Sequence, residues 1–538
     1  MKTKHLLQSI LLLLLTAAVS LAQTDLSIFE AMKPRSIGPA GMSGRVTSID
    51  VVRHNRNIIY AGTASGGLWK SVSGGTSWEP LFDSEEVASI GVVTIDPSNA
   101  STIWVGTGEG NPRNSLNGGY GVYKSLDAGK TWMHMGLKNT KNVHRLIVHP
   151  DDPNTVWVGA IGSPWAEHEE RGVFKTTDGG KTWNKVLYDI PRAGIADLVI
   201  DPTNPNKLVA AMWEHRRYPW FFNSGGPASG IYISHDGGET WDRKTSDHGL
   251  PEGELGRIGL AIAPSMPDRI YAYVESKENA VYRSDDGGNS WNRVSRQGNI
   301  GNRPFYYADL WVDPKNENRV YSLHTYVTSS EDGGRSWGMF VDPSYIHVDN
   351  HAYYIHPDDP NFIVLGNDGG MEVSRDRGGS WHYMENLPIG QFYHVSYDME
   401  TPYNVMGGMQ DNGAWLGPSQ LLKQGGIRNS YWERIVGGDG FDVVPDPLDT
   451  RYGYSLSQGA NIQRYDRQTG QMIGIRPEHP NGEFIRWNWN AGVNIDPFDK
   501  KTVYLGGQYL FKSTDHGDSW EIISPDLTTN DPEKQKQS

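Results

Sequence analysis

The sequence predicts an all-β protein, built as a single β-propeller of about ten four-stranded blades that carry Asp-box turns. Three observations support this fold: a turn that recurs eight times, paired apolar strands before each turn, and a composition rich in glycine, tryptophan and tyrosine. The same blades could also be grouped as two smaller propellers. No segment sustains an apolar period of about 3.6 residues, so little helix is expected.

The recurring turn has the form Ser-x-Asp-x-Gly-x-Thr/Ser-Trp. Seven of its eight copies keep the aspartate, and Ser73 replaces it in the first copy. The side chain of this residue can accept hydrogen bonds from backbone N–H groups further along the turn, and the glycine permits a positive φ. Such a turn indicates a fold and says little about catalysis. The copies end at Trp78, Trp132, Trp183, Trp241, Trp291, Trp337, Trp381 and Trp520.

The spacing of these turns gives the number of blades. Neighbouring copies from Trp78 to Trp381 lie 44 to 58 residues apart. Trp432 fits a further unit with a degenerate turn, and RYDRQTG at 464–470 fits another, which brings the count to ten. Each unit also contains two apolar strands around an Asp/Pro turn, as in LIVHPDDPNTVWVGA at 146–160. Four short antiparallel strands in this length make one propeller blade.

The N-terminus has the pattern of an export signal. Lys2 and Lys4 precede an apolar run at 6–15, and the small residues Ser20 and Ala22 precede a cleavage point before Gln23. We therefore expect a signal peptide at 1–22, a propeller at 23–527 and a polar tail at 528–538, in a secreted or periplasmic protein. No later apolar run approaches the ~20 residues that a membrane-spanning helix needs. The chain has no cysteine, so its stability depends on core burial without disulfides.

Composition and motifs exclude several classes of function. The formal net charge of −14 argues against nucleic-acid binding, which usually needs a basic face. The sequence has no Walker loop, dinucleotide fingerprint or nucleophile elbow, so no cofactor is predicted.

The Asp-boxes, with the strands between them, resemble the bacterial sortilin-like, BNR-repeat family, whose members are often labelled glycosyl hydrolases. The resemblance extends from IGPAGMSGRV at 37–46 to ISPDLTTND at 523–531 and includes GNDGG at 366–370. Sortilin itself is similar in having a ten-bladed propeller that binds peptides. The resemblance implies an extracellular peptide, protein or glycan partner.

A more distant resemblance is to xyloglucan-degrading Asp-box enzymes, which pair two seven-bladed propellers. Their catalytic aspartate lies in a TDVGG-like stretch of the first blade. The matching stretch here is TASGG at 63–67, in which Ala64 occupies the position of the aspartate. This difference argues against a direct transfer of their mechanism.

Candidate catalytic residues come from the loops between the second and third strands of a blade, which lie on the rim opposite the Asp-boxes. Asp368 in GNDGG and Asp411 in GMQDNGAW occupy equivalent places in adjacent blades, and Glu109 lies in GTGEGNPRN. Two carboxyl groups on one rim can hydrolyse a glycoside, at about 5–5.5 Å in retaining enzymes and 6.5–9.5 Å in inverting ones. The alternative is that both aspartates only close turns.

Candidate ligand-binding residues lie in the same loops and at the starts of the innermost strands, where ordinary propellers favour small apolar residues. Their polarity predicts a charged channel mouth, or else ion pairs across the channel. The set is Arg45, Arg113, His144, Arg145, Arg257, His347, Asp349, His351, Tyr393, Gln410, Asp439 and Arg486.

Two long loops, at 163–172 and 212–226, add further candidates. The second carries Trp213 and Arg216, with Arg217 and several more aromatic residues beside them. Exposed aromatic side chains of this kind can stack on sugars or hold a peptide side chain, unless the loop folds over its own rim.

No metal site is predicted, although HVDNH at 347–351 offers one weak pattern. Asp349 and His351 share a face of an extended strand and could chelate an ion. His347 and His351 would lie about 13 Å apart along a strand, from a rise of about 3.3 Å per residue, unless the run bends.

These features favour a secreted propeller that binds an extracellular peptide or glycan at its channel mouth. The alternative is a glycoside hydrolase that acts on polysaccharide through Asp368, Asp411 and Glu109. Whether the protein is an enzyme therefore stays open at this point.

Overall fold

The computed structural model describes residues 32, 35–38 and 43–536, and the following concerns the compact unit that begins at Gly38. The predicted signal peptide lies outside the described residues. Within them the structure contains strands and short 3-10 turns but no α-helix, and it has no helix long and apolar enough to cross a membrane.

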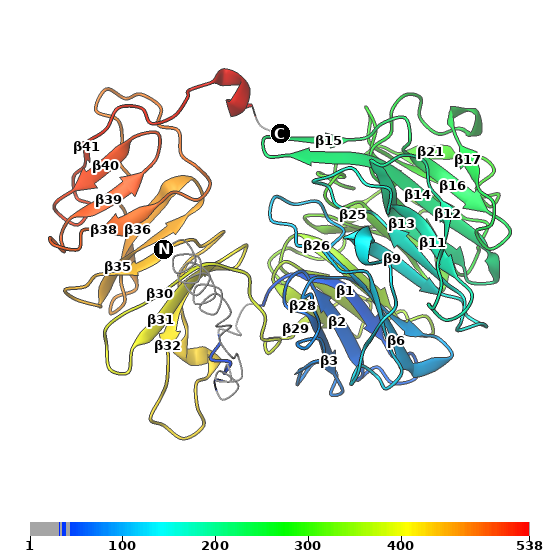
Figure 1. The fold of residues 1–538 in the computed structure, drawn as a ribbon, viewed down its shortest axis with the longest axis horizontal. Helices are drawn as coiled ribbons and strands as arrows, with labels where there is room; N and C mark the ends of the chain where they lie inside the picture. Colours follow the sequence, from blue (N-terminus) through cyan, green and yellow to red (C-terminus); the bar gives the residue numbers. More distant parts are fainter. Residues whose placement is uncertain (1–31, 33–34, 39–42, 537–538) are drawn as a thin grey trace, which may run out of the picture. The chain divides into compact units, whose positions relative to one another are not determined.

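Ten antiparallel sheets follow one another along the chain, each in strand order (Figure 1). Nine sheets have four strands, and the fourth has an additional strand, β15, which pairs with β14. The prediction of an all-β fold with ten four-stranded propeller blades is confirmed.

Blades 1 to 5 have the following strands. Blade 1 contains β1 (Val46–Val51), β2 (Ile59–Thr63), β3 (Leu68–Ser71) and β4 (Glu79–Pro80); blade 2, β5 (Ile90–Asp96), β6 (Asn99–Thr107), β7 (Val122–Ser125) and β8 (Met133–His134); blade 3, β9 (Val143–Val148), β10 (Val156–Ala160), β11 (Gly172–Thr176) and β12 (Asn184–Leu187); blade 4, β13 (Ala193–Asp201), β14 (Asn204–Tyr218), β15 (Phe221–Ser224), β16 (Gly230–Ser234) and β17 (Asp242–Lys244); blade 5, β18 (Ile258–Ile262), β19 (Ile270–Val274), β20 (Ala280–Ser284) and β21 (Asn292–Ser295).

Blades 6 to 10 complete the series. Blade 6 contains β22 (Asp309–Asp313), β23 (Asn316–Leu323), β24 (Val327–Ser330) and β25 (Gly338–Met339); blade 7, β26 (Asn350–Ile355), β27 (Ile363–Asn367), β28 (Gly370–Ser374) and β29 (His382–Tyr383); blade 8, β30 (Phe392–Tyr397), β31 (Asn404–Met409), β32 (Gly413–Pro418) and β33 (Glu433–Val436); blade 9, β34 (Val443–Pro445), β35 (Tyr452–Ser457), β36 (Asn461–Asp466) and β37 (Gln471–Gly474); blade 10, β38 (Val493–Ile495), β39 (Val503–Gly506), β40 (Leu510–Ser513) and β41 (Glu521–Ile522).

The contacts between blades show how the series closes. The first strand of each blade from 1 to 6 contacts the first strand of the next, and β26 of blade 7 contacts β1. Apolar residues of blades 1 and 7 share one core cluster, which includes Val46, Ile59, Val364 and Met371. Seven blades therefore close on themselves, and blades 8 to 10 follow outside that closure. This arrangement favours the alternative grouping into smaller propellers.

The Asp-boxes connect the third and fourth strands of their blades, as the sequence predicts. In the third blade, Asp178 accepts hydrogen bonds from the Thr182 backbone (3.0 Å) and hydroxyl (2.6 Å). The box tryptophan then ties neighbouring blades together, since Trp183 Nε1 donates to Met135 O at 2.7 Å. The degenerate turn at 464–470 has the same place between β36 and β37, where Asp466 accepts from the Gln468 backbone at 2.9 Å.

Candidate functional site

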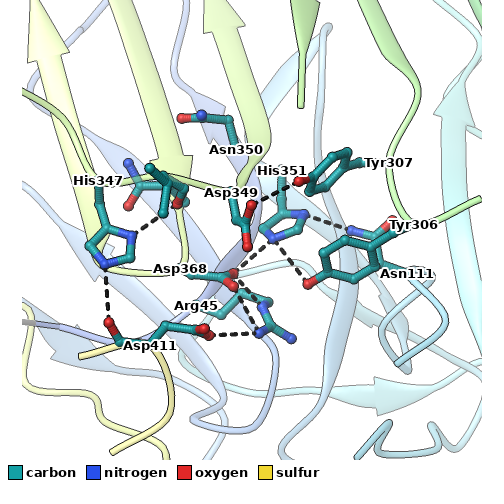
Figure 2. Close-up of polar contacts among 12 residues, drawn as sticks. Arg45, Asn111, Tyr306, Tyr307, His347, Asp349, Asn350, His351, Asp368 and Asp411 are labelled. Atoms are coloured by element: carbon teal, nitrogen blue, oxygen red, sulfur yellow. Dashed lines mark hydrogen bonds and ion pairs between the residues drawn. The ribbon is translucent and has the colours of Figure 1, made fainter. Parts of the chain in front are cut away.

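A buried arginine lies at the centre of the rim opposite the Asp-boxes. Arg45 immediately precedes β1, and its side chain is 1% exposed. Its Nε and Nη2 donate to the two carboxylate oxygens of Asp368 at 2.5 and 3.1 Å (Figure 2). Its Nη1 donates to Glu109 Oε1 at 3.0 Å. Nη2 also lies 3.5 Å from Asp411 Oδ2. One guanidinium thus joins blades 1, 2, 7 and 8.

Asp368 is enclosed beneath this arginine. It follows β27, its side chain is 1% exposed, and it lies 2.8 Å from His351 Nε2. Asn111 Nδ2 lies 2.9 Å from His351 Nδ1, so donation by the amide leaves the proton on Nε2, where it faces Asp368. Burial opposes ionisation, but Arg45 and His351 outweigh it and hold the pKa of Asp368 well below its ordinary range.

Asp411 has the opposite electrostatic environment. It lies between β31 and β32, and its side chain is 25% exposed, so it faces solvent while Asp368 does not. Burial, the adjacent charge of Asp368 and that of Asp439 raise the pKa of Asp411 to about 9, against the smaller effect of Arg45. At neutral pH the pair therefore consists of an ionised Asp368 and a protonated Asp411. This is the arrangement in which a carboxyl group can donate a proton.

Asp349 is the third carboxyl group of the cluster. It precedes β26 and accepts from Arg303 Nη2 at 3.0 and 3.1 Å and from the Tyr307 hydroxyl at 2.7 Å. Asp349, Asp368 and Asp411 each place a carboxylate oxygen within 4.8 Å of the others. Asp349 and Asp411 have φ of +60° and +62°, which non-glycine residues rarely adopt and which concentrates at functional sites.

The geometry does not support a metal-binding site at HVDNH (347–351). Both ring nitrogens of His351 have protein partners, and Asp349 is held by Arg303 and Tyr307. His347 Nδ1 lies 2.9 Å from Val348 O, and its Nε2 lies 3.4 Å from Asp411 O. The charge of the three carboxyl groups is offset by guanidinium groups, so we assign no metal here.

Asp349 and Asp411 line a cleft of about 840 Å³, whereas Asp368 and Arg45 do not. Of the predicted residues, Arg113, Asp349, Tyr393, Gln410, Asp411 and Asp439 line this cleft. Asp439 accepts from the Asp411 backbone and from Trp489 Nε1, both at 2.7 Å. Trp489 lines the cleft and is 59% exposed, so its indole presents an open aromatic surface while its Nε1 is held by Asp439.

Three predicted binding residues form ion pairs and hydrogen bonds within the channel instead. Arg145 donates to Asp197 at 2.7 Å and to Asp309 at 2.6 Å. Arg257 donates to Tyr306 O at 2.5 Å and lies 3.2 Å from His144 Nε2. These side chains are buried or mostly buried between blades, so the alternative of mutual pairing across the channel describes them better than ligand binding does.

Three other predicted binding residues lie outside the cleft. Trp213 is fully buried in β14 and stacks on His215, so it is not an exposed ring. The segment 212–226, expected to be a loop, is instead a hairpin. Strand β14 continues to Tyr218 and pairs with β15. Arg216 bonds to Pro164 O at 3.4 Å. Arg486 bonds to Asp526 and Thr528 beside a separate cavity.

The sequence interpretation missed Arg303, Tyr306, Tyr307 and Trp489. The first three occur in NRPFYYAD, directly before the innermost strand β22. Arg45 and Asp349 likewise lie before the innermost strands of their blades. The expectation of polar residues before the innermost strands could therefore also have identified Arg303, Tyr306 and Tyr307. Trp489 lies before β38, next to the predicted Arg486.

Comparison with known proteins supports the sequence resemblances. A family model described as Sortilin-Vps10 (sortilin, neurotensin receptor 3) matches residues 120–249. A xyloglucanase of Paenibacillus sp. is 26% identical over 242 residues, which is 40% of this chain and 22% of that enzyme. Xyloglucanase Xgh74A of Acetivibrio thermocellus is 24% identical over 345 residues, or 55% of this chain and 38% of the enzyme. The matched stretches thus span well under half of these relatives.

Among solved structures, the GH74 xyloglucanase from Xanthomonas campestris superposes with a TM-score of 0.53. The two chains are 16% identical, and the match covers 91% of this chain and 80% of that one. At this identity the likeness concerns the fold alone. The resemblance to sortilin-like and xyloglucanase Asp-box propellers is confirmed.

Proposed function

We propose that this protein is an exported glycoside hydrolase whose proton donor is Asp411. The observation that carries the proposal is that the carboxyl group of Asp411 lines the cleft next to Asp368, whose carboxylate is enclosed and held by Arg45 and His351. The relatives named as xyloglucanases support glycan chemistry over peptide capture, which reverses the order favoured by the sequence. The activity, the export and the extracellular glycan are all parts of the proposal.

The roles of the carboxyl groups follow from their exposure. Asp368 is covered by Arg45 and His351, so it is a positioning residue that keeps the proton on Asp411. Glu109 is likewise buried, and it balances the charge of Arg45. Asp349 lines the cleft within 4.8 Å of Asp411, oxygen to oxygen. A nearest-oxygen separation of at most 4.8 Å lies closer to the retaining range than to the inverting range. In the retaining reaction Asp349 attacks the anomeric carbon as Asp411 protonates the leaving oxygen, and water activated by Asp411 then releases the sugar from Asp349.

The proposal is tested by incubating the protein with a panel of polysaccharides and measuring reducing ends and product anomers. We expect sugar release with retention of configuration. The protein would fail as a glycosidase if no polysaccharide or oligosaccharide in a broad panel were cleaved. Products with inverted configuration would exclude Asp349 as the nucleophile.

The pH profile gives a second test of the proton donor. Because Asp411 must be protonated to act, activity should fall as the pH rises through about 9, its raised pKa. Asp368→Asn removes the neighbouring negative charge that raises this pKa, so the falling limb should move to lower pH. A limb that stays in place or moves upward would show that Asp368 does not control the proton. The assay is kcat against pH for both proteins.

The open face of Trp489 predicts a sugar-stacking role. Trp489→Ala should raise KM roughly two- to tenfold with little change in kcat, which corresponds to the 0.5–1.5 kcal/mol typical of aromatic stacking. Trp220, which is 63% exposed but does not line the cleft, provides the control Trp220→Ala. Equal effects of the two substitutions on KM would remove Trp489 from the site.

A second candidate function is glycan capture without turnover. It is favoured by Ala64, which stands where the xyloglucan-degrading enzymes have their catalytic aspartate. Tight binding of an oligosaccharide with no release of reducing ends would support it over hydrolysis.

A further inference from the structure

One wall of the cleft contains an arginine that has no acidic partner. Arg217, near the end of β14, is 7% exposed and lines the cleft. Its Nη1 donates to Asn114 Oδ1 at 2.6 Å and its Nη2 donates to Pro112 O at 3.2 Å. Nε has no hydrogen-bond partner, and no Asp or Glu among the described residues forms an ion pair with this side chain.

This environment is costly for a cation. A buried guanidinium with only neutral partners loses hydration without the compensation of a counter-ion. Burial accordingly lowers the pKa of Arg217. Arg45, by contrast, has the carboxylates of Asp368 and Glu109 on its guanidinium. Arg171 and Arg257 are also buried without an ion pair to an acid of the described residues, but only Arg217 among these three lines the cleft.

Two more guanidinium groups lie in the same cleft. Arg113 donates to the Tyr306 hydroxyl at 3.0 Å and lies 3.5 Å or more from Asp368 and Asp411. Arg303 makes its bonds to Tyr307 and Asp349 through Nη2 alone. Aromatic rings separate these groups, since Arg217 lies 4.6 Å over Phe222, which in turn packs on Phe305 at 5.3 Å.

We propose that Arg217 binds the carboxylate of an acidic sugar, so that the substrate is a polysaccharide containing uronic acid units. This inference rests on the proposed function, because it assigns the substrate class of the same cleft. The carboxylate would supply the counter-ion that Arg217 lacks, with Arg303 in the same cleft. The neighbouring Phe222 and Phe305 offer apolar faces to the sugar ring. Guanidinium groups match carboxylates in a bidentate geometry, which gives specificity as well as affinity.

The test measures binding separately from turnover. Isothermal titration of the full chain is done with trigalacturonate and with a neutral xyloglucan oligosaccharide. We expect the acidic trisaccharide to bind at least about tenfold more tightly, and Arg217→Gln to abolish that preference. Arg217→Lys, which keeps the charge without the planar fork, should retain part of it. The adjacent Arg216→Gln, outside the cleft, should behave as wild type.

The outcomes separate the two proposals. Equal or tighter binding of the neutral oligosaccharide, or trigalacturonate binding unchanged in Arg217→Gln, would overturn the acidic-sugar inference while leaving hydrolysis possible. Binding of trigalacturonate that depends on Arg217, with no cleavage of any glycan, would support this inference and contradict the hydrolase. Binding of a peptide through its free C-terminal carboxylate, lost on amidation and absent for trigalacturonate, would assign Arg217 to a peptide instead. Cooperative melting of each variant without ligand, at a temperature close to that of the wild type, shows that the proteins are folded.

Discussion

Asp411→Asn should reduce kcat about 10²- to 10⁴-fold on polysaccharide while KM changes little, which is the usual range for loss of a general acid. The substitution preserves shape and polarity. Its side-chain amide can donate to Asp368 as the protonated carboxyl does, and its backbone still donates to Asp439. Asparagine also tolerates the φ of +62° that this position adopts. The protein should therefore fold and bind substrate but lack the proton for the leaving oxygen.

A control variant and a control substrate test whether the loss of activity comes from the missing proton donor. Asp358→Asn removes an exposed aspartate that pairs with Arg53 at 2.7 Å away from the cleft, and it should leave kcat unchanged. An aryl glycoside with an acidic phenol as its leaving group needs no protonation, so Asp411→Asn should lose far less activity on it than on polysaccharide. An equal loss on both substrates would show that Asp411 does not act as the acid.

The fold was predictable because its signals are local. Each Asp-box closes its own turn, as Asp178 does with Thr182, and the tryptophan that ends each box marks one blade. Counting these turns therefore gives ten blades. Closure after seven blades depends on contacts between β1 and β26, which lie about 300 residues apart in the sequence. No turn motif indicates the contact between β1 and β26. Whether the blades form one ring or smaller propellers therefore could not be predicted from the sequence.

The site was predictable only as a region. The rule that polar residues start the innermost strands identified Arg45, Asp349 and His351, which the structure places around Asp368. The same rule also selected Arg145 and Arg257, which serve ion pairs and hydrogen bonds inside the channel. The residues around Asp368 differ from Arg145 and Arg257 in which side chains they contact. These contacts depend on residues from several blades, which the sequence pattern does not reveal. Trp213 shows the same limit, because an aromatic residue in a polar stretch gives no sign that a strand will bury it.

Arg45→Met should produce the largest loss of stability, about 3–5 kcal/mol in the free energy of unfolding, which is typical when one partner of a buried ion pair is removed. Asp368 and Glu109 would then be buried without a counter-ion, at side-chain exposures of 1% and 3%. The guanidinium also connects blades 1, 2, 7 and 8, so its loss weakens the contact that closes the seven blades. Urea titration followed by tryptophan fluorescence measures the change.

The cause of this loss can be separated from packing by a second variant. If the loss of stability comes from buried carboxylates without a counter-ion, adding Asp368→Asn to Arg45→Met should restore part of it. One of the two unpaired carboxylates is then neutral. If lost packing is responsible, the two substitutions should instead destabilise the protein additively. Lowering the pH should also narrow the gap between Arg45→Met and wild type, because protonation neutralises the same carboxylates. A gap that is constant from neutral to acidic pH would contradict the central electrostatic role assigned to Arg45.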